Sequence, residues 1–129
     1  MNHKFTMDTP VQRVIHDPAF GSFGRLLFPV NTGCWSGATL GSLKLTWYSH
    51  IDPSKTVEIV NTPKERSLAG ETVFYNIYTD KEKTADPAKK NTGLFFFRGK
   101  PGAPFAICNT GGAFAYVAAI HDSFPHALE

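Results

Sequence analysis

The most constraining feature of this chain is a short apolar run that ends in glycines. Phe105-Ala-Ile-Cys108 continues directly into Asn-Thr-Gly-Gly-Ala113, and a helix-start pattern follows around Ser123 to Pro125. A buried strand that enters a glycine turn and then a helix leaves backbone N–H groups pointing into open space, where they suit a negatively charged oxygen. No nucleophile accompanies the turn, so the segment predicts half of an active site.

Size and composition allow one ordinary globular domain. The chain has 129 residues, of which 42% are hydrophobic and 19% charged, which is enough apolar side chain to build a core. The formal net charge of +2 is too small to indicate nucleic acid or an anionic membrane surface as a partner.

The cysteines and the N-terminus carry little functional information. Cys34 and Cys108 match no metal-ligand spacing, so two buried free thiols are the simplest interpretation, with a disulfide as the alternative. The first ten residues have no apolar core of signal-peptide length, and no apolar run is long enough to span a membrane. These features favour a cytoplasmic protein that requires neither a membrane nor a cofactor.

The middle of the chain predicts strands. Val57–Val60 alternates between prolines, and Thr72–Thr79 is dense in β-branched and aromatic residues. Residues 80–92 are charged and contain a proline, which indicates a solvated loop. Leu94–Arg98 predicts another strand, which the turn Gly99-Lys-Pro-Gly102 connects to the run that begins at Phe105.

The remaining segments complete the expected organisation. The strands at 94–98 and 105–108 lack polar alternation, so we expect both of their faces to be covered. A helix is expected to begin near Asp122 or Ser123, with Pro125 in its first turn. Nothing in the sequence stops that helix, so we expect the chain to be truncated within it. Residues 1–20 are expected to be irregular.

The strand, glycine turn and helix together resemble the segment after the third strand of α/β-hydrolases, where esterases and lipases carry a His-Gly-Gly-Gly-type motif. The matching stretch is Thr110-Gly-Gly-Ala-Phe114, and its extension to Val117 looks like the dienelactone-hydrolase-like and acetylxylan-esterase-like branch. The resemblance covers residues 56–129. It implies an α/β fold in which these residues form the N-terminal part of an incomplete hydrolase sheet, with residues 1–55 as an N-terminal extension.

The resemblance also implies roles for particular residues. The backbone N–H groups of Gly112 and Ala113 would form the oxyanion hole, and Thr110, Phe114 and Tyr116 would line a pocket. Thr110 stands where the family often has His, and Ala113 where it often has a third Gly; Ala keeps its N–H donor when its φ is negative. The chain contains no Gly-x-Ser-x-Gly elbow, so the triad Ser, acid and His are expected beyond residue 129.

Other constellations are weaker. His121-Asp122-Ser123 contains the three triad residue types, but consecutive side chains diverge, so an N-cap at Asp122 or Ser123 is the better interpretation. His121 and His126 lack the spacing of two metal ligands on one helix face, and Gly99–Gly102 lacks the P-loop pattern. A further set of aromatic residues could line a sugar or acyl pocket, although such residues more often belong to a core, and Tyr116 has the best claim to a pocket: Trp35, Trp47, Tyr48 and Tyr116.

These observations predict the N-terminal part of a carboxylic-ester hydrolase that is inactive alone. Its expected partners are a C-terminal half or a second copy that covers the exposed sheet, with a small ester as the substrate of the whole enzyme. The alternative is a self-contained, non-enzymatic, β-rich module whose aromatic residues bind a carbohydrate or a peptide. A split enzyme of two chains is a third hypothesis.

Overall fold

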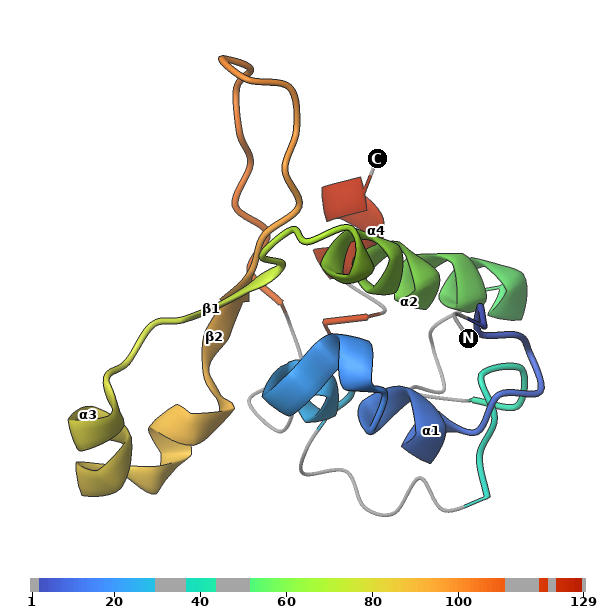
Figure 1. The fold of residues 1–129 in the computed structure, drawn as a ribbon, viewed down its shortest axis with the longest axis horizontal. Helices are drawn as coiled ribbons and strands as arrows, with labels where there is room; N and C mark the ends of the chain where they lie inside the picture. Colours follow the sequence, from blue (N-terminus) through green and yellow to red (C-terminus); the bar gives the residue numbers. More distant parts are fainter. Residues whose placement is uncertain (1–2, 30–36, 44–51, 111–118, 121–122, 129) are drawn as a thin grey trace.

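A computed structural model describes residues 3–29, 37–43, 52–110, 119–120 and 123–128. In chain order the elements are α1 (Val11–Ile15), the 3-10 helix η1 (Pro18–Leu26), α2 (Pro53–Leu68), β1 (Phe74–Asn76), α3 (Asp80–Ala85), the 3-10 helix η2 (Pro87–Asn91), β2 (Gly93–Phe95) and α4 (Ser123–Leu128). α2 and α4 lie together above α1 and η1, and β1 and β2 connect this body to α3 and η2 (Figure 1).

Three Asp-Pro pairs begin three of these helices. In each pair the proline occupies the first helical turn, where its missing N–H is not needed, and the aspartate is the N-cap. The cap carboxylate accepts the backbone N–H two residues further on in every case. These donors are Ala19 at 2.9 Å, Ser54 at 2.9 Å and Ala88 at 3.1 Å.

The strand predicted at Val57–Val60 is wrong, because these residues lie inside the helix α2. The two prolines that resembled strand boundaries have other positions: Pro53 is in the first turn, and Pro63 is buried inside the helix. The buried side chains recur with helical spacing and face one side of α2; they are Thr56, Ile59, Val60, Pro63 and Lys64. This helical period distinguishes a helix from a strand here, whereas alternation over only four residues is too short to exclude a helix.

The two predicted strands at 72–79 and 94–98 are confirmed in part. β1 and β2 pair antiparallel in a two-stranded sheet, with Phe74 opposite Phe95 and Asn76 opposite Gly93. The pairing extends by one further bond, from the Phe96 N–H to the Val73 carbonyl at 2.9 Å. The ladder is shorter than the apolar runs, so the sequence overestimates the length of both strands.

The solvated loop predicted at 80–92 is wrong in its conformation, although its side chains are indeed exposed or half-buried. α3 begins with a capping box in which the Glu82 N–H donates to the Thr79 hydroxyl and the Thr79 N–H donates to the Glu82 carboxylate. The pattern Thr-x-x-Glu predicts this reciprocal cap from sequence. Asp86 then caps η2, so two short helices fill the connection between β1 and β2.

The buried strand predicted at Phe105–Cys108 is also wrong as regards the described residues. Phe105 is 85% exposed and Ile107 is 73% exposed, and residues 104–109 form neither a helix nor a strand. The turn before them is confirmed, because the Ala103 N–H donates to the Lys100 carbonyl at 3.1 Å. This hairpin, residues 96–110, projects away from the body (Figure 1). A strand needs a neighbour to bury its faces, and none of the described residues supplies one.

The core joins both ends of the chain. Buried side chains from α1, η1, α2 and α4 pack together with Phe5 and Leu40; the largest include Phe20, Leu27, Phe28 and Ile120. The boundary expected between residues 55 and 56 falls within α2, and residues on both sides of it contribute to this core. Residues 1–20, expected to be irregular, include α1 and the start of η1.

Candidate functional site

A hydrogen bond joins Thr110, the residue before the predicted glycine turn, to the start of α4. The hydroxyls of Thr110 and Ser123 lie 2.7 Å apart, although 13 positions separate the two residues. Thr110 is half-buried and Ser123 is buried, at the first position of α4. The chain therefore leaves the projecting hairpin at Thr110 and returns beside it at the start of a helix.

Ala119, Ile120 and the start of α4 are anchored in the hydrophobic core. Ala119 and Ile120 are buried, and the Phe124 N–H donates to the Ala119 carbonyl at 2.9 Å. The Phe124 ring makes edge contacts with the rings of Phe95 in β2 and Phe97 just after it. The distances between ring centroids are 4.9 Å to Phe95 and 5.1 Å to Phe97. These contacts hold Ala119 and the start of α4 against Phe95 of β2 and Phe97.

Most of the residues predicted to form the oxyanion hole and its pocket lie outside the described part of the chain. Thr110 is the only predicted pocket residue among the described ones, and its hydroxyl forms a hydrogen bond with the Ser123 hydroxyl. Gly112, Ala113, Phe114 and Tyr116 lie outside the described residues. The same holds for the other aromatic candidates Trp35, Trp47 and Tyr48, and for Cys34, His50, His121 and Asp122. Cys108, expected to be buried, is half-buried with a free thiol.

No acid–base–nucleophile set converges among the described side chains. The Ser123 hydroxyl contacts the Thr110 hydroxyl rather than a histidine. His126, the described histidine nearest in sequence, is exposed on α4. Within the described ranges, no group of three or more His, Cys, Asp or Glu side chains is placed to hold a metal ion.

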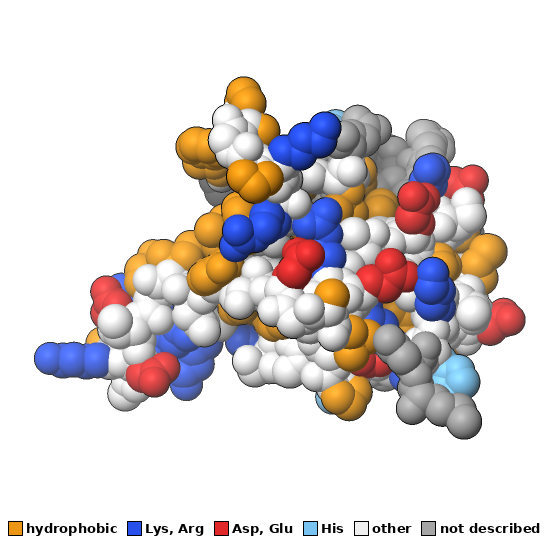
Figure 2. All heavy atoms as spheres, turned by 45° about the horizontal axis from the view of Figure 1, so that its top comes forward, with side chains coloured by type: hydrophobic (Ala, Val, Ile, Leu, Met, Phe, Trp, Pro, Cys, Tyr) orange, Lys and Arg blue, Asp and Glu red, His pale blue; other side chains and the backbone are white. Residues whose placement is uncertain are grey.

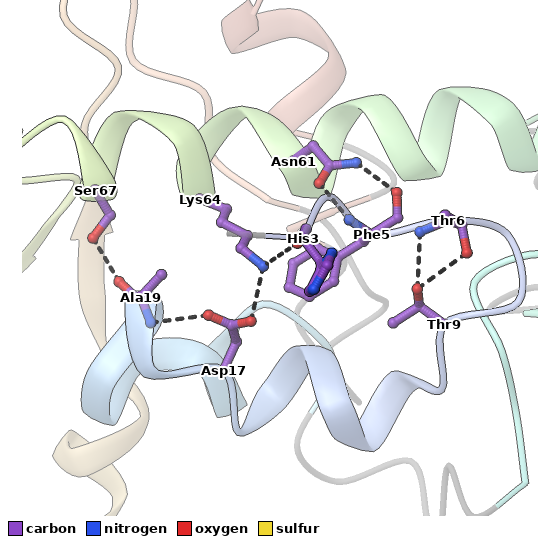
Figure 3. A network of polar contacts seen from close by, with 9 residues as sticks. All are labelled: His3, Phe5, Thr6, Thr9, Asp17, Ala19, Asn61, Lys64 and Ser67. Carbon is purple, nitrogen blue, oxygen red and sulfur yellow. Dashed lines mark hydrogen bonds and ion pairs between the residues drawn. The ribbon is translucent and has the colours of Figure 1, made fainter. Parts of the chain in front are cut away.

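A second polar cluster, which the sequence reasoning missed, joins the N-terminal segment and α1–η1 to α2 (Figure 3). The Lys64 ammonium donates to the His3 carbonyl at 2.7 Å and to the Asp17 carboxylate at 3.0 Å. It also lies 4.0 Å from the centroid of the Phe5 ring. The side chains of Lys64 and Asp17 are only 9% and 14% exposed, so this is a largely buried ion pair. The helical stripe on α2 is the sequence signal that could have indicated it.

Asn61 reinforces this cluster one turn earlier on α2. Its side-chain oxygen accepts the Phe5 N–H at 2.8 Å, and its side-chain nitrogen donates to the Phe5 carbonyl at 3.0 Å. The Ser67 hydroxyl donates to the Ala19 carbonyl near the other end of α2 (Figure 3). These bonds attach the N-terminal segment and η1 to one face of α2, and a hollow opens beside them.

Comparisons with known proteins give no assignment: no protein-family model matches the chain, and neither curated proteins nor solved structures give a significant match. None of the helices in the described part of the chain combines the length and the apolar character needed to cross a bilayer.

Proposed function

We propose that this chain supplies the oxyanion-hole turn of a serine-dependent carboxylic-ester hydrolase and forms the N-terminal part of its α/β-hydrolase domain. The donors are the backbone N–H groups of Gly112 and Ala113. The nucleophile, acid and base come from a segment outside these 129 residues, since the sequence contains no Gly-x-Ser-x-Gly elbow.

The Thr110–Ser123 hydrogen bond is the observation that carries this proposal. An oxyanion turn requires the chain to leave an extended segment, expose backbone amides and enter a helix close to where it left. The 2.7 Å contact brings the last residue before the glycines to the first residue of α4. The residues before and after the glycine segment thus lie close together, which supports the proposal of a preorganised donor turn.

The exposed hairpin gives independent support. Phe105 and Ile107 are 85% and 73% exposed, so an uncharged and largely apolar segment stands in solvent. Isolated apolar strands are unstable unless neighbouring strands and helices cover them. Insertion of residues 105–108 into a larger sheet would bury these side chains and place the glycine turn at the carboxyl end of a central strand, where ligands bind in open α/β sheets.

The chemistry assigned to the turn is electrostatic. The Ser oxygen of the elbow bonds to the ester carbonyl carbon, its proton passes to the triad His, and the carbonyl oxygen becomes an oxyanion facing Gly112 and Ala113. Collapse of the intermediate breaks the bond to the alkoxy group, which leaves as the alcohol with that proton. Water then releases the acid by the same steps. Loss of one such donor lowers the rate about 10²–10³-fold.

The test uses the protein made from the complete reading frame that encodes this chain, assayed with p-nitrophenyl acetate. Ala113→Pro removes one backbone donor, whereas the control Ala113→Gly retains it. We expect Ala113→Pro to lower kcat about 10²–10³-fold with little change in KM, because the donor acts in the transition state. Ala113→Gly should remain close to the parent enzyme.

Two results contradict the proposal. One is an active enzyme in which Ala113→Pro and Ala113→Gly have the same kcat as the parent. The other is a complete protein with no esterase activity that binds an oligosaccharide or a peptide, which would favour the self-contained binding module instead.

A further inference from the structure

We propose a second site, distinct from the glycine turn: a cleft between the N-terminal segment, α1 and α2 that binds a phosphate monoester. The cleft has a volume of about 570 Å³ and is lined by charged and imidazole side chains together with Pro18, Ala19 and Leu68. A smaller hollow of about 450 Å³ next to it shares His3 and Arg13. The proposal does not depend on hydrolase activity.

The cleft gathers positively charged and proton-donating groups from three parts of the chain. His3 comes from the N-terminal segment, Arg13 from α1 and Lys64 from α2, and all three line the cleft. Arg13 and His16 are three positions apart across the end of α1, so both can face the same ligand. An oxyanion with three terminal oxygens can therefore be contacted from several directions.

Apart from Lys64, these groups have no acidic partner in the part of the chain that the structure describes. Among the described residues, the side chains of Arg13 and His3 have no hydrogen-bond or ion-pair partner. The His16 ring donates its Nδ1–H to the Gln12 carbonyl at 2.8 Å, so its Nε2 is a second donor only in the imidazolium form. A guanidinium fork beside two imidazoles is a donor set suited to phosphate.

The one carboxylate of the cleft is already occupied. One oxygen of Asp17 accepts the Lys64 ammonium at 3.0 Å, and the other accepts the Ala19 N–H at 2.9 Å. Lys64 and Asp17 therefore cancel each other as charges, and Arg13 determines the sign of the remaining site. The described residues that line the cleft offer donors to a ligand and include no unoccupied carboxylate that would repel an anion.

The dimensions indicate a ligand larger than inorganic phosphate. Pockets of this volume hold small organic molecules. Pro18 and Leu68 supply an apolar wall beside the donors. A phosphate monoester fits both features, with its phosphate on Arg13 and the imidazoles and its organic part along this wall.

The test titrates the chain with inorganic phosphate as the probe, at ionic strength held constant with sodium chloride, and follows backbone amide shifts by NMR. We expect saturable shifts confined to residues 12–18 and the N-terminal segment. Arg13→Gln should weaken phosphate binding about tenfold or more, since it removes a charge-assisted donor.

Lys55→Gln is the matched control, because it removes one positive charge from an exposed position on α2 that is paired with Glu58. It should leave the phosphate affinity unchanged. Equal weakening by Arg13→Gln and Lys55→Gln, or shifts that do not saturate, would overturn the site. Acetate is titrated in parallel; affinity for acetate equal to that for phosphate would overturn the assignment to phosphate. Circular dichroism of both variants verifies that they are folded.

Discussion

At the scale of single residues, one close backbone approach lies where α1 meets η1. Gly24 is buried, and a Cβ at this position would collide with the backbone carbonyl of Ile15. A backbone carbonyl cannot rotate away as a flexible side chain can. The absence of a side chain at Gly24 is therefore what allows η1 to pack against the end of α1.

Gly24→Ala should destabilise the fold by about 1–3 kcal/mol, because the added methyl group overpacks a fixed backbone contact. Gly99→Ala is the control, since a Cβ there meets nothing within 4 Å. Urea unfolding followed by far-UV circular dichroism compares the two. Equal midpoints for the two variants would refute this account of Gly24.

The buried ion pair makes a second prediction at this scale. Asp17→Asn leaves the Lys64 ammonium largely buried without its counter-charge, so we expect a loss of about 3–5 kcal/mol. Lys64→Met should also destabilise the fold, because it leaves the Asp17 carboxylate unpaired. The double variant should lose less than the sum of the two, as a double-mutant cycle by urea unfolding will measure. Strict additivity would mean that the pair is not coupled.

At the scale of elements, the Asp52 cap makes the start of α2 sensitive to pH. Hydrogen bonds from the Ser54 hydroxyl and backbone N–H lower the pKa of Asp52. A carboxylate whose pKa is lowered by folding stabilises the folded state above its unfolded pKa of about 3.9. That contribution is lost as the pH falls through the lower folded pKa.

Asp52→Ala should therefore lower the urea midpoint at neutral pH, by less than Gly24→Ala does, and the difference from the parent should vanish at strongly acid pH. Asp52→Asn keeps a capping oxygen and should restore most of the midpoint at neutral pH. A deficit in Asp52→Ala that is the same at neutral and acid pH would exclude the carboxylate as its cause.

The elements also show what the sequence could and could not predict. The Asp-Pro caps and the Thr79–Glu82 capping box are local patterns, and both form as their chemistry dictates. The short alternation at Val57–Val60 led to a wrong prediction of a strand, because the flanking prolines are compatible with a helix as well as with a strand. The apolar runs at β1 and β2 predicted the two strands but not their length, since ladder length depends on neighbours.

The same distinction applies to the sites. The start of α4 at Ser123 was predictable because Pro125 and the cap residues are local. The Thr110–Ser123 contact and the ion pair of Lys64 with Asp17 were not, since they join residues 13 and 47 positions apart. Long-range contacts of this kind depend on how helices pack, and no short motif encodes them.

At the scale of the whole molecule, most of the large exposed apolar side chains among the described residues lie on or next to β1, β2 and the projecting hairpin. They are Tyr75, Ile77, Leu94, Phe96, Phe105 and Ile107. Figure 2 shows hydrophobic side chains over the hairpin and the adjoining strands, with Lys and Arg side chains among them. Exposed apolar patches of this kind drive association, and the free edges of a two-stranded sheet allow it.

We therefore expect the isolated chain to self-associate. Sedimentation analysis at several concentrations should show an apparent mass that rises with concentration. Phe105→Ser with Ile107→Ser should weaken association about tenfold or more, because each side chain contributes apolar burial. The control is Met7→Ser, which changes an exposed side chain outside the hairpin. A parent chain that stays monomeric throughout would contradict this expectation.

The central claim is that the amides of Gly112 and Ala113 face a developing negative charge. The most direct measurement is the ¹⁵N–¹H spectrum of the complete enzyme before and after inactivation by diethyl p-nitrophenyl phosphate, whose phosphoryl oxygen occupies the oxyanion position. The account predicts that these two amide protons move strongly downfield, because each gains a charge-assisted hydrogen bond. Unchanged shifts for both amides in the fully inactivated enzyme would contradict it.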